Sequence, residues 1–290
     1  MNVNVKFESS LYRFFGKKFV VFVSLLFLLV LFFLSFISVT NGASVVPDVV
    51  VGNETELFDA ISVAPNKKSH VISLNENVTL KSPLEISKNK NITLAMFGSA
   101  YVSVCLIGSN GVDTIVVKSG GVLELLGGVI VTHADGDIGR GVYVESKGTL
   151  ILSGGEISGN TVVDSGGGGV YNVGRFVMYD GVIVNNNASF GGGMYNSEEA
   201  TFEMFGGEIT RNTAFTGGGV EYSVGSVSGD FILSGGKIFD NTATEGPDPD
   251  FSVIHVDKFP YFGVLHLLFI GLVIAIIGCV LLFYRLKKRK

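Results

Sequence analysis

The sequence predicts an all-β fold, a right-handed parallel β-helix, between two hydrophobic segments. Three observations predict it: blocks of about 26 residues repeat through the second half of the chain, short runs within each block alternate apolar with other residues, and glycine clusters and an asparagine recur at matching places. Alternating runs between turn residues indicate strands. Self-similar units of this size stack into solenoids.

The N-terminal segment, residues 1–43, contains an uncharged apolar run from Phe19 to Val39. Basic residues precede this run, at Lys6, Arg13, Lys17 and Lys18. A basic region, an apolar core and then small residues are typical of a signal peptide, here cut after Gly42. A run of about 20 residues is also long enough to span a bilayer uncut. Residues 1–43 are therefore predicted to be a signal peptide or a signal anchor.

The stretch from Asn53 to Ala64, NETELFDAISVA, predicts a short amphipathic helix with an acidic first turn. Its apolar residues are Leu57, Ile61 and Val63. Such a helix would cap the first coil of the β-helix, whose strand edges and apolar core are otherwise exposed. The β-runs VISL, VTL, LEI, NITL and TIVV after it predict the first coils.

Each repeated block, at residues 148–172, 174–196, 200–222 and 229–244 with a weaker copy from Gly120, predicts three short strands. Because alternate side chains of a strand point to opposite sides, the apolar positions predict inward columns. The first strands supply two columns. One column is Leu123, Leu150, Phe176, Phe202 and Phe231, and the other is Leu125, Leu152, Met178, Met204 and Leu233. The second strands supply Ile157, Ile183, Ile209, Ile238, and the third supply Val142, Val170, Met194, Val220.

Asparagines recur at Asn160, Asn186, Asn212 and Asn241. They are predicted to adopt the left-handed conformation of a sharp turn and to form a hydrogen-bonded ladder from coil to coil. The glycine clusters at 166–169, 191–193 and 217–219 are predicted to allow positive φ and close backbone approach at the corner between second and third strands. They lack the Lys-Ser or Lys-Thr of a phosphate-binding loop. Residues 44–258 have room for about seven or eight coils.

The C-terminal segment begins with Glu245–Val253, whose two prolines predict a partial last coil or a spacer. The apolar run at 262–284 is long enough for a transmembrane helix, and the basic tail at 285–290 is expected to stay in the cytoplasm. We therefore expect a cell-membrane protein with its β-helix outside and its C-terminus cytoplasmic. It spans the membrane once, or twice if residues 1–43 are not removed.

The composition constrains the partners. The chain has 290 residues, 47% of them hydrophobic, and the predicted extracellular part carries 12 Lys and Arg against 25 Asp and Glu, a net charge of −13. Such acidity argues against nucleic acid and anionic membrane surfaces as partners. Cys105 and Cys279 lie in different predicted regions, so no disulfide within the chain is expected. Glycosylation sequons occur at Asn53, Asn77, Asn91 and Asn187.

The repeat ITRNTAFTGGGV, residues 209–220, resembles the repeats of right-handed β-helix adhesin-like surface proteins. It is also similar to repeats of the polymorphic membrane protein family. The resemblance covers about residues 120–244 well and 71–119 loosely, and it implies a pectin-lyase-like solenoid at the cell surface. Two departures count against an autotransporter: isoleucines such as Ile209 stand where that family has phenylalanine, and a single predicted membrane helix replaces the terminal β-barrel.

The stretch HADGDIGR holds the residue types that a polysaccharide lyase or hydrolase would need, in His133, Asp135, Asp137 and Arg140. Such enzymes use paired carboxylates, or carboxylates that hold calcium beside a base. Asp-Gly is also a strong turn former, and no second acidic cluster aligns with this one. We therefore predict no catalytic, metal or cofactor site and no enzymatic activity. A cell-surface lyase or hydrolase on the same scaffold is the alternative.

Tyrosines supply the one candidate binding face. Tyr143, Tyr171 and Tyr195 each follow an inward residue of a third strand, which points them outward in a column. Exposed aromatic rings can bind sugars or protein partners, although stacking that merely stiffens the sheet is the alternative. The sequence thus predicts a membrane-anchored surface protein that acts in adhesion or in binding glycans or surface proteins.

Overall fold

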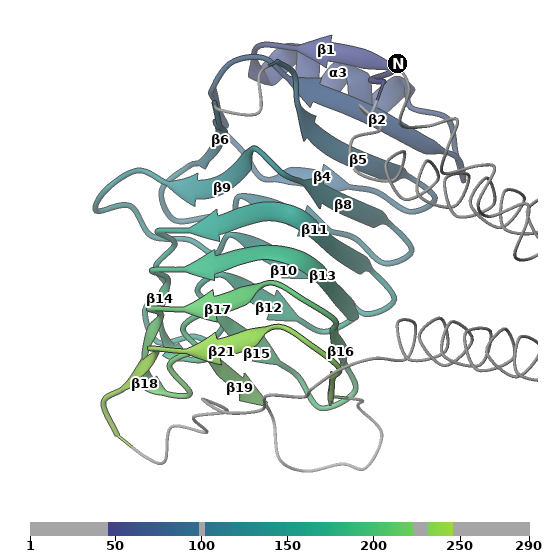
Figure 1. The fold of residues 1–290 in the computed structure, drawn as a ribbon. Helices are drawn as coiled ribbons and strands as arrows, with labels where there is room; N and C mark the ends of the chain where they lie inside the picture. The colour runs from purple at the N-terminus through teal and green to yellow at the C-terminus, as the bar shows by residue number, and fades with distance from the viewer. Residues whose placement is uncertain (1–45, 99–101, 223–230, 246–290) are drawn as a thin grey trace, which may run out of the picture. The chain divides into compact units, whose positions relative to one another are not determined.

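The computed structural model describes residues 46–98, 102–222 and 231–245. The chain divides into two compact units, Met1–Val46 and Pro47–Lys290, and the described residues belong almost wholly to the second. They form an all-β parallel solenoid of about seven turns with a single helix in this described part (Figure 1). The predicted solenoid is confirmed, and its architecture fits a right-handed β-helix. The hydrophobic segments at 1–43 and 262–284 lie outside the described residues.

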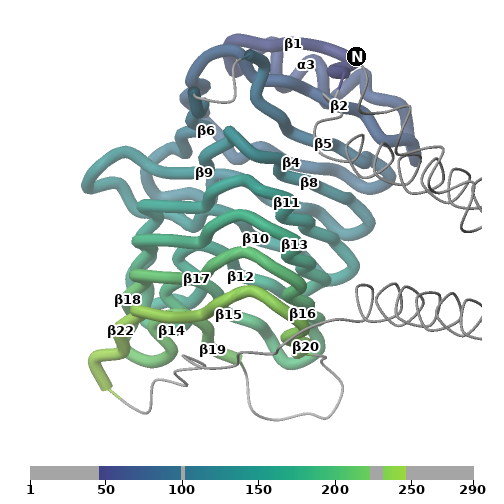
Figure 2. The backbone as a smooth tube through the Cα atoms, viewed as in Figure 1, coloured from purple at the N-terminus to yellow at the C-terminus, as the bar shows by residue number. Residues whose placement is uncertain are grey.

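The strands of each coil contribute in turn to three faces, and the named strands of neighbouring coils pair in parallel (Figures 1 and 2). The first face consists of β1 Val49–Val51, β2 Ser69–Leu74, β5 Asn91–Met96, β8 Val122–Leu126, the first halves of β11 Thr149–Ser158 and β13 Arg175–Val184, β16 Thr201–Met204 and β20 Phe231–Leu233. The second face consists of β3 Val78–Thr79, β6 Val104–Gly108, β9 Val129–His133, the second halves of β11 and β13, β17 Glu208–Thr210 and β21 Lys237–Phe239.

The third face consists of β4 Leu84–Ile86, β7 Ile115–Val117, β10 Val142–Val144, β12 Val170–Asn172, β15 Met194–Asn196 and β19 Val220–Tyr222. A small sheet of β14 Asn187–Phe190, β18 Thr213–Thr216 and β22 Thr242–Ala243 lies between the second and third faces in the later coils. The first and second faces form one sheet, because β11 and β13 continue round their shared corner. Gly154 and Gly181 have φ of 124° and 103° there, which allows the strands to bend.

The predicted inward columns are confirmed. Leu150 pairs with Phe176 and Phe176 with Phe202, and all three side chains are fully buried. The rings of Phe176 and Phe202 stack with their centroids 5.0 Å apart. The isoleucine column of the second face and the Val142 column of the third are also buried, while Phe231 and Leu233 in the last coil are half-buried. Burial of each such side chain contributes about 1.5–3 kcal/mol.

The asparagine ladder is confirmed, but the conformation predicted for its members is wrong. The positive φ values belong to the residues just before the ladder, Gly159, Asn185, Arg211 and Asp240, at 68°, 56°, 54° and 53°. The chain reverses at those residues, so that each following asparagine can turn both its main-chain N–H and its side chain toward the next coil. In each coil, therefore, the residue with positive φ forms the turn, and the asparagine that follows it forms the ladder.

The glycine clusters act as predicted. Gly167, Gly191 and Gly217 have φ of 69°, 58° and 60°, in the left-handed region that favours glycine. The next residue in each cluster lies against the following coil: a Cβ on Gly192 would be 2.3 Å from the main-chain oxygen of Thr213. A side chain there would push adjacent coils apart.

The predicted capping helix is α3, Glu54–Val63. Asn53 is its N-cap, and its side-chain Oδ1 accepts a hydrogen bond from the Glu56 main-chain N–H at 3.0 Å. The buried residues are Leu57, Ala60, Ile61 and, just after the helix, Ala64, which lie on one helical stripe. Val63, the third apolar residue of the predicted helix, falls off this stripe and is 78% exposed. Strand β1, which pairs with β2, was not predicted.

Candidate binding face

The tyrosine column lies at the centre of the third face. Tyr143 of β10 pairs with Tyr171 of β12, and Tyr171 pairs with Tyr195 of β15. The ring centroids are 5.4 Å apart in the first pair and 5.0 Å apart in the second, with interplanar angles of 22° and 25°. The inward neighbours Val142, Val170 and Met194 are buried. Their burial fixes the tyrosines on the outer side of the solenoid.

The stacking decides which part of each tyrosine reaches solvent. All three side chains are half-buried, because neighbouring rings cover each other's flat faces. A Cβ on Gly166 would lie 3.0 Å from the Tyr195 ring, so the loop of residues 159–169 also packs close to the column. The column therefore presents ring edges and hydroxyl groups. Stacking on a sugar ring requires an open aromatic face, whereas a protein partner can bind through edges and hydroxyls.

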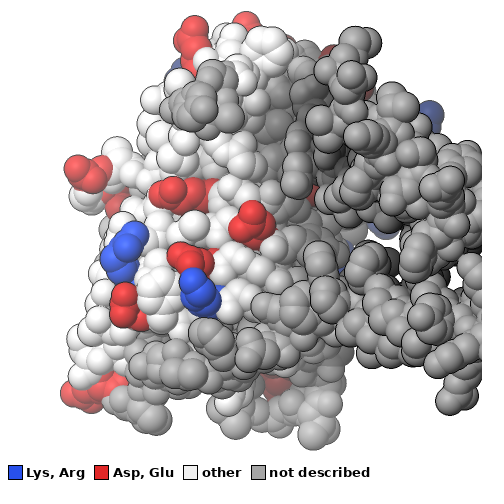
Figure 3. Space-filling model, viewed as in Figure 1, with Lys and Arg blue, Asp and Glu red and all other residues white. Residues whose placement is uncertain are grey.

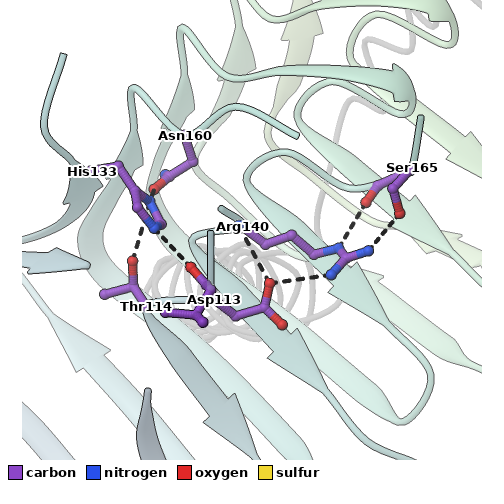
Figure 4. A network of polar contacts seen from close by, with 8 residues as sticks. Asp113, Thr114, His133, Arg140, Asn160 and Ser165 are labelled. Carbon is purple, nitrogen blue, oxygen red and sulfur yellow. Dashed lines mark hydrogen bonds and ion pairs between the residues drawn. The ribbon is translucent and has the colours of Figure 1, made fainter. Parts of the chain in front are cut away.

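Arg140 holds a positive charge against this column; its polar contacts are drawn in Figure 4. Its guanidinium carbon lies 5.0 Å from the Tyr171 ring centroid and 5.8 Å from that of Tyr143. The guanidinium donates to Asp113 Oδ1 at 3.1 Å, to Ser165 Oγ at 2.5 Å and to the main-chain oxygen of Gly166 at 3.0 Å. Arg140 thus ties together the loops of three successive coils, and its charge is balanced by Asp113.

The hydroxyl of Tyr171, the central ring of the column, has a raised pKa. Burial raises its pKa, the neighbouring hydroxyls of Tyr195 and Tyr143 raise it further, and Arg140 acts in the opposite direction. The phenol therefore stays protonated at neutral pH and can donate a hydrogen bond.

An ion-paired cluster extends the third face toward the N-terminal end. Lys118 Nζ lies 3.1 Å from Glu85 Oε1 and 3.1 Å from Glu145 Oε1. Hydrogen bonds to these carboxylates raise the pKa of Lys118. The pKa of Glu145 is lowered, first by the main-chain N–H of Ser119, which donates to Oε2 at 3.0 Å, and then by Lys118, against an opposing effect of burial.

His133 belongs to the interior rather than to a surface site (Figure 4). It is buried, with Nδ1 2.9 Å from Asn160 Oδ1 and Nε2 2.9 Å from the main-chain oxygen of Val112. Glycines make room for the ring, since a Cβ on Gly139 would lie 2.3 Å from Nε2. His133 therefore continues the asparagine ladder by one rung toward the N-terminus.

The remaining members of the HADGDIGR stretch lie apart from His133 and Arg140. Asp135 is exposed on the turn after β9, and Asp137 is half-buried there, with its main-chain N–H donating to the Ala134 oxygen at 3.0 Å. Within the described residues, His, Cys, Asp and Glu form no group of three or more that could hold a metal ion. The four side chains thus do not converge on one centre.

Cys105 lies on the second face as a free, half-buried thiol. Burial raises its pKa first, and the charge of Glu156 raises it further. The thiol is therefore predominantly protonated at neutral pH, which makes it a weak nucleophile.

Exposed apolar side chains at the corners were missed by the sequence reasoning. Tyr179 and Phe205 stack at 5.4 Å on the corner between the first and second faces, and both are exposed. Phe190 and Phe215 are exposed on β14 and β18. The repeats contain a signal for the Tyr179–Phe205 pair, because each of these residues directly follows the last inward residue of its strand run, FVM or FEM.

Comparison of the chain with protein-family models, curated proteins and solved structures gave no match. Within the part of the chain that the structure describes, no helix has the length and apolar character needed to cross a membrane.

Proposed function

We propose that this chain is a membrane-anchored β-solenoid of the cell surface that works by binding and not by catalysis. Residues 1–43 export the chain or anchor it, the helix at 262–284 holds it in the cell membrane, and the tail at 285–290 remains in the cytoplasm. The solenoid, within residues 44–258, then faces outward and attaches the cell to glycans or to surface proteins. It needs no cofactor and binds no nucleic acid.

The non-enzymatic part of the proposal rests on the hydrogen bonds that His133 and Arg140 make within the solenoid. His133 is bonded within the ladder, and Arg140 is bonded to Asp113, Ser165 and Gly166. A general acid or base must be able to reach the substrate proton. His133 is buried and Arg140 is engaged with its neighbours, so these groups serve the scaffold.

The candidate binding face consists of Tyr143, Tyr171 and Tyr195. Tyrosine combines a large apolar area with a hydroxyl and loses little conformational entropy on binding, which suits it to recognition. The rings cover each other's faces at 5.4 Å and 5.0 Å. This geometry favours a protein partner over a sugar chain stacked along the column.

The test is to incubate the full-length chain, in nanodiscs of uncharged lipid, with a panel of neutral and acidic polysaccharides. We expect no depolymerisation, and a triple variant with Tyr143, Tyr171 and Tyr195 changed to Ser should lose attachment to cells. Tyr179→Ser is the matched control, because that tyrosine is exposed on a different corner. Depolymerisation of any polysaccharide by the wild type, abolished in Asp135→Ala or Asp137→Ala, would establish the lyase or hydrolase alternative instead.

A further inference from the structure

An apolar ridge runs along the corner between the second and third faces. Five successive coils each place one large apolar side chain there, and these side chains are 37–64% exposed. The members of the ridge are Val112, Ile138, Val163, Phe190 and Phe215. Single exposed apolar residues are ordinary on protein surfaces, but exposed apolar residues that recur on one corner of successive coils mark an interaction site.

Main-chain contacts between the loops place these residues on neighbouring coils of one corner. The Gly111 N–H donates to the Ile138 oxygen at 2.6 Å, and the Val162 N–H donates to the Asn187 oxygen at 2.9 Å. Phe190 of β14 pairs with Thr216 of β18, next to Phe215. Neighbouring coils are about 4.8 Å apart, so the ridge is about 20 Å long. Strands β14 and β18, which carry Phe190 and Phe215, lie at the left edge of Figure 1.

The border of the ridge is acidic. The corner loops carry Asp135, Asp137, Asp164, Asp240 and Glu245, all exposed or half-buried. Of the two arginines in these loops, Arg140 is paired with Asp113, while Arg211 is exposed. Figure 3 shows acidic side chains distributed along this side of the solenoid, including its left edge. The ridge therefore combines apolar contact area with a negative potential.

We propose that this ridge binds a protein partner that presents apolar side chains beside Lys or Arg. The inference rests on the proposed attachment function and names the partner's chemistry. Charge complementarity favours such a basic partner, because the acidic border of the ridge attracts basic segments and repels acidic ones. A second copy of this chain would bring Asp135 and Asp164 against the same acidic border, and anionic lipid headgroups would meet the same repulsion.

The experiment measures fluorescence anisotropy of labelled peptides with the full-length chain in nanodiscs of uncharged lipid. The probe is Ser-Leu-Lys repeated four times, and its controls replace every Lys with Glu or every Leu with Ser. We expect the probe to bind at least tenfold more tightly than either control peptide and to weaken as salt is raised. A chain with Phe190→Ser and Phe215→Ser should bind the probe at least tenfold more weakly.

The matched control variant is Phe205→Ser, because Phe205 and Phe190 are both 43% exposed but Phe205 lies on the other corner. It should bind the probe as wild type does. Asp135→Lys changes only the charge of an exposed turn, so it tests the proposal even if the double variant unfolds. This variant should bind the Lys peptide more weakly than the wild type does and the Glu peptide more tightly.

Three results would overturn the ridge proposal: equal binding of the Lys and Glu peptides, equal loss in Phe205→Ser, or self-association of the wild type that the double variant abolishes. None of these touches the proposed attachment function, which fails if the wild type degrades a polysaccharide or if the triple tyrosine variant still attaches to cells.

Discussion

Asn186 Oδ1 accepts two hydrogen bonds from Asn160, one from the main-chain N–H at 3.0 Å and one from Nδ2 at 2.9 Å. Asn212 repeats the arrangement toward Asn186, and Asn241 toward Asn212, so one amide geometry links four coils. Each Nδ2 also donates to a main-chain oxygen of the preceding coil, such as that of Ile157 at 2.9 Å from Asn186. The ladder therefore joins main chain and side chain in the same step.

Replacement of Asn186 by Ala should lower the free energy of unfolding by about 3 kcal/mol. Asn186 is buried, and its loss leaves the Asn160 main-chain N–H without its acceptor and removes the hydrogen bonds that join Asn186 to Asn160 Nδ2 and to the Ile157 oxygen. Urea unfolding monitored by circular dichroism measures the change. Asn187→Ala, at the exposed neighbouring position, is the matched control and should change stability by less than about 0.5 kcal/mol. Similar losses in the two variants would contradict a special role of the ladder.

Replacement of Phe202 by Ala should lower the free energy of unfolding by about 3–5 kcal/mol, because it removes a fully buried ring that stacks on Phe176 and packs at a tilt against Phe231. Phe202→Asp should unfold the neighbouring coils, since an unpaired charge would enter the apolar column. Phe205→Ala, three residues away and exposed, should be nearly neutral. Thermal unfolding distinguishes them, and an unchanged midpoint in Phe202→Ala would refute the inward column.

Replacement of Arg140 by Met should raise the pKa of Tyr171 further. Arg140 lowers this pKa, while burial, Tyr195 and Tyr143 raise it, so removal of the guanidinium leaves only the raising effects. NMR titration of ring-labelled tyrosine, assigned with Tyr171→Phe, measures the shift. Arg175→Met is the control, because Arg175 pairs with Glu203 on the first face. A Tyr171 pKa that stays the same or falls in Arg140→Met would show that the cation does not act on the column.

The ion-paired cluster around Glu145 should make the solenoid less stable in acid. The pKa of Glu145 is below the ordinary value of 4.5, so its stabilisation is complete above that value and is lost as the pH falls through the lower folded pKa. Glu145→Gln should therefore flatten the acid side of a plot of melting temperature against pH. Glu199→Gln, at an exposed position, should leave the curve unchanged. A Glu145→Gln curve as steep as that of the wild type would rule out this linkage.

The repeats allowed the inner architecture to be predicted from the sequence. Leu150, Phe176 and Phe202 occur at the same place in their blocks, and parallel stacking in register puts equal places above one another. The asparagine ladder and the glycine corners follow from the same rule.

The candidate site was less predictable. The order of Tyr143, Tyr171 and Tyr195 follows from register, but the overlap of their faces depends on the side-chain rotamers and the distance between coils. Arg140 has partners 25–27 residues away, in loops of unequal length that do not align by the repeat. Their contact could not be deduced from spacing.

The sequence by itself determined the solenoid, its inward columns and its ladder, because their residues recur at similar steps of 26 to 29 residues and equivalent positions stack in register. Only the tertiary structure decided the roles of the residues that do not repeat. It placed His133 in the ladder and Arg140 on the tyrosines, and it aligned the exposed apolar residues of five loops into one ridge. The physical reason is that such contacts depend on how far each loop extends and where the adjacent coil lies, which are properties of the folded backbone.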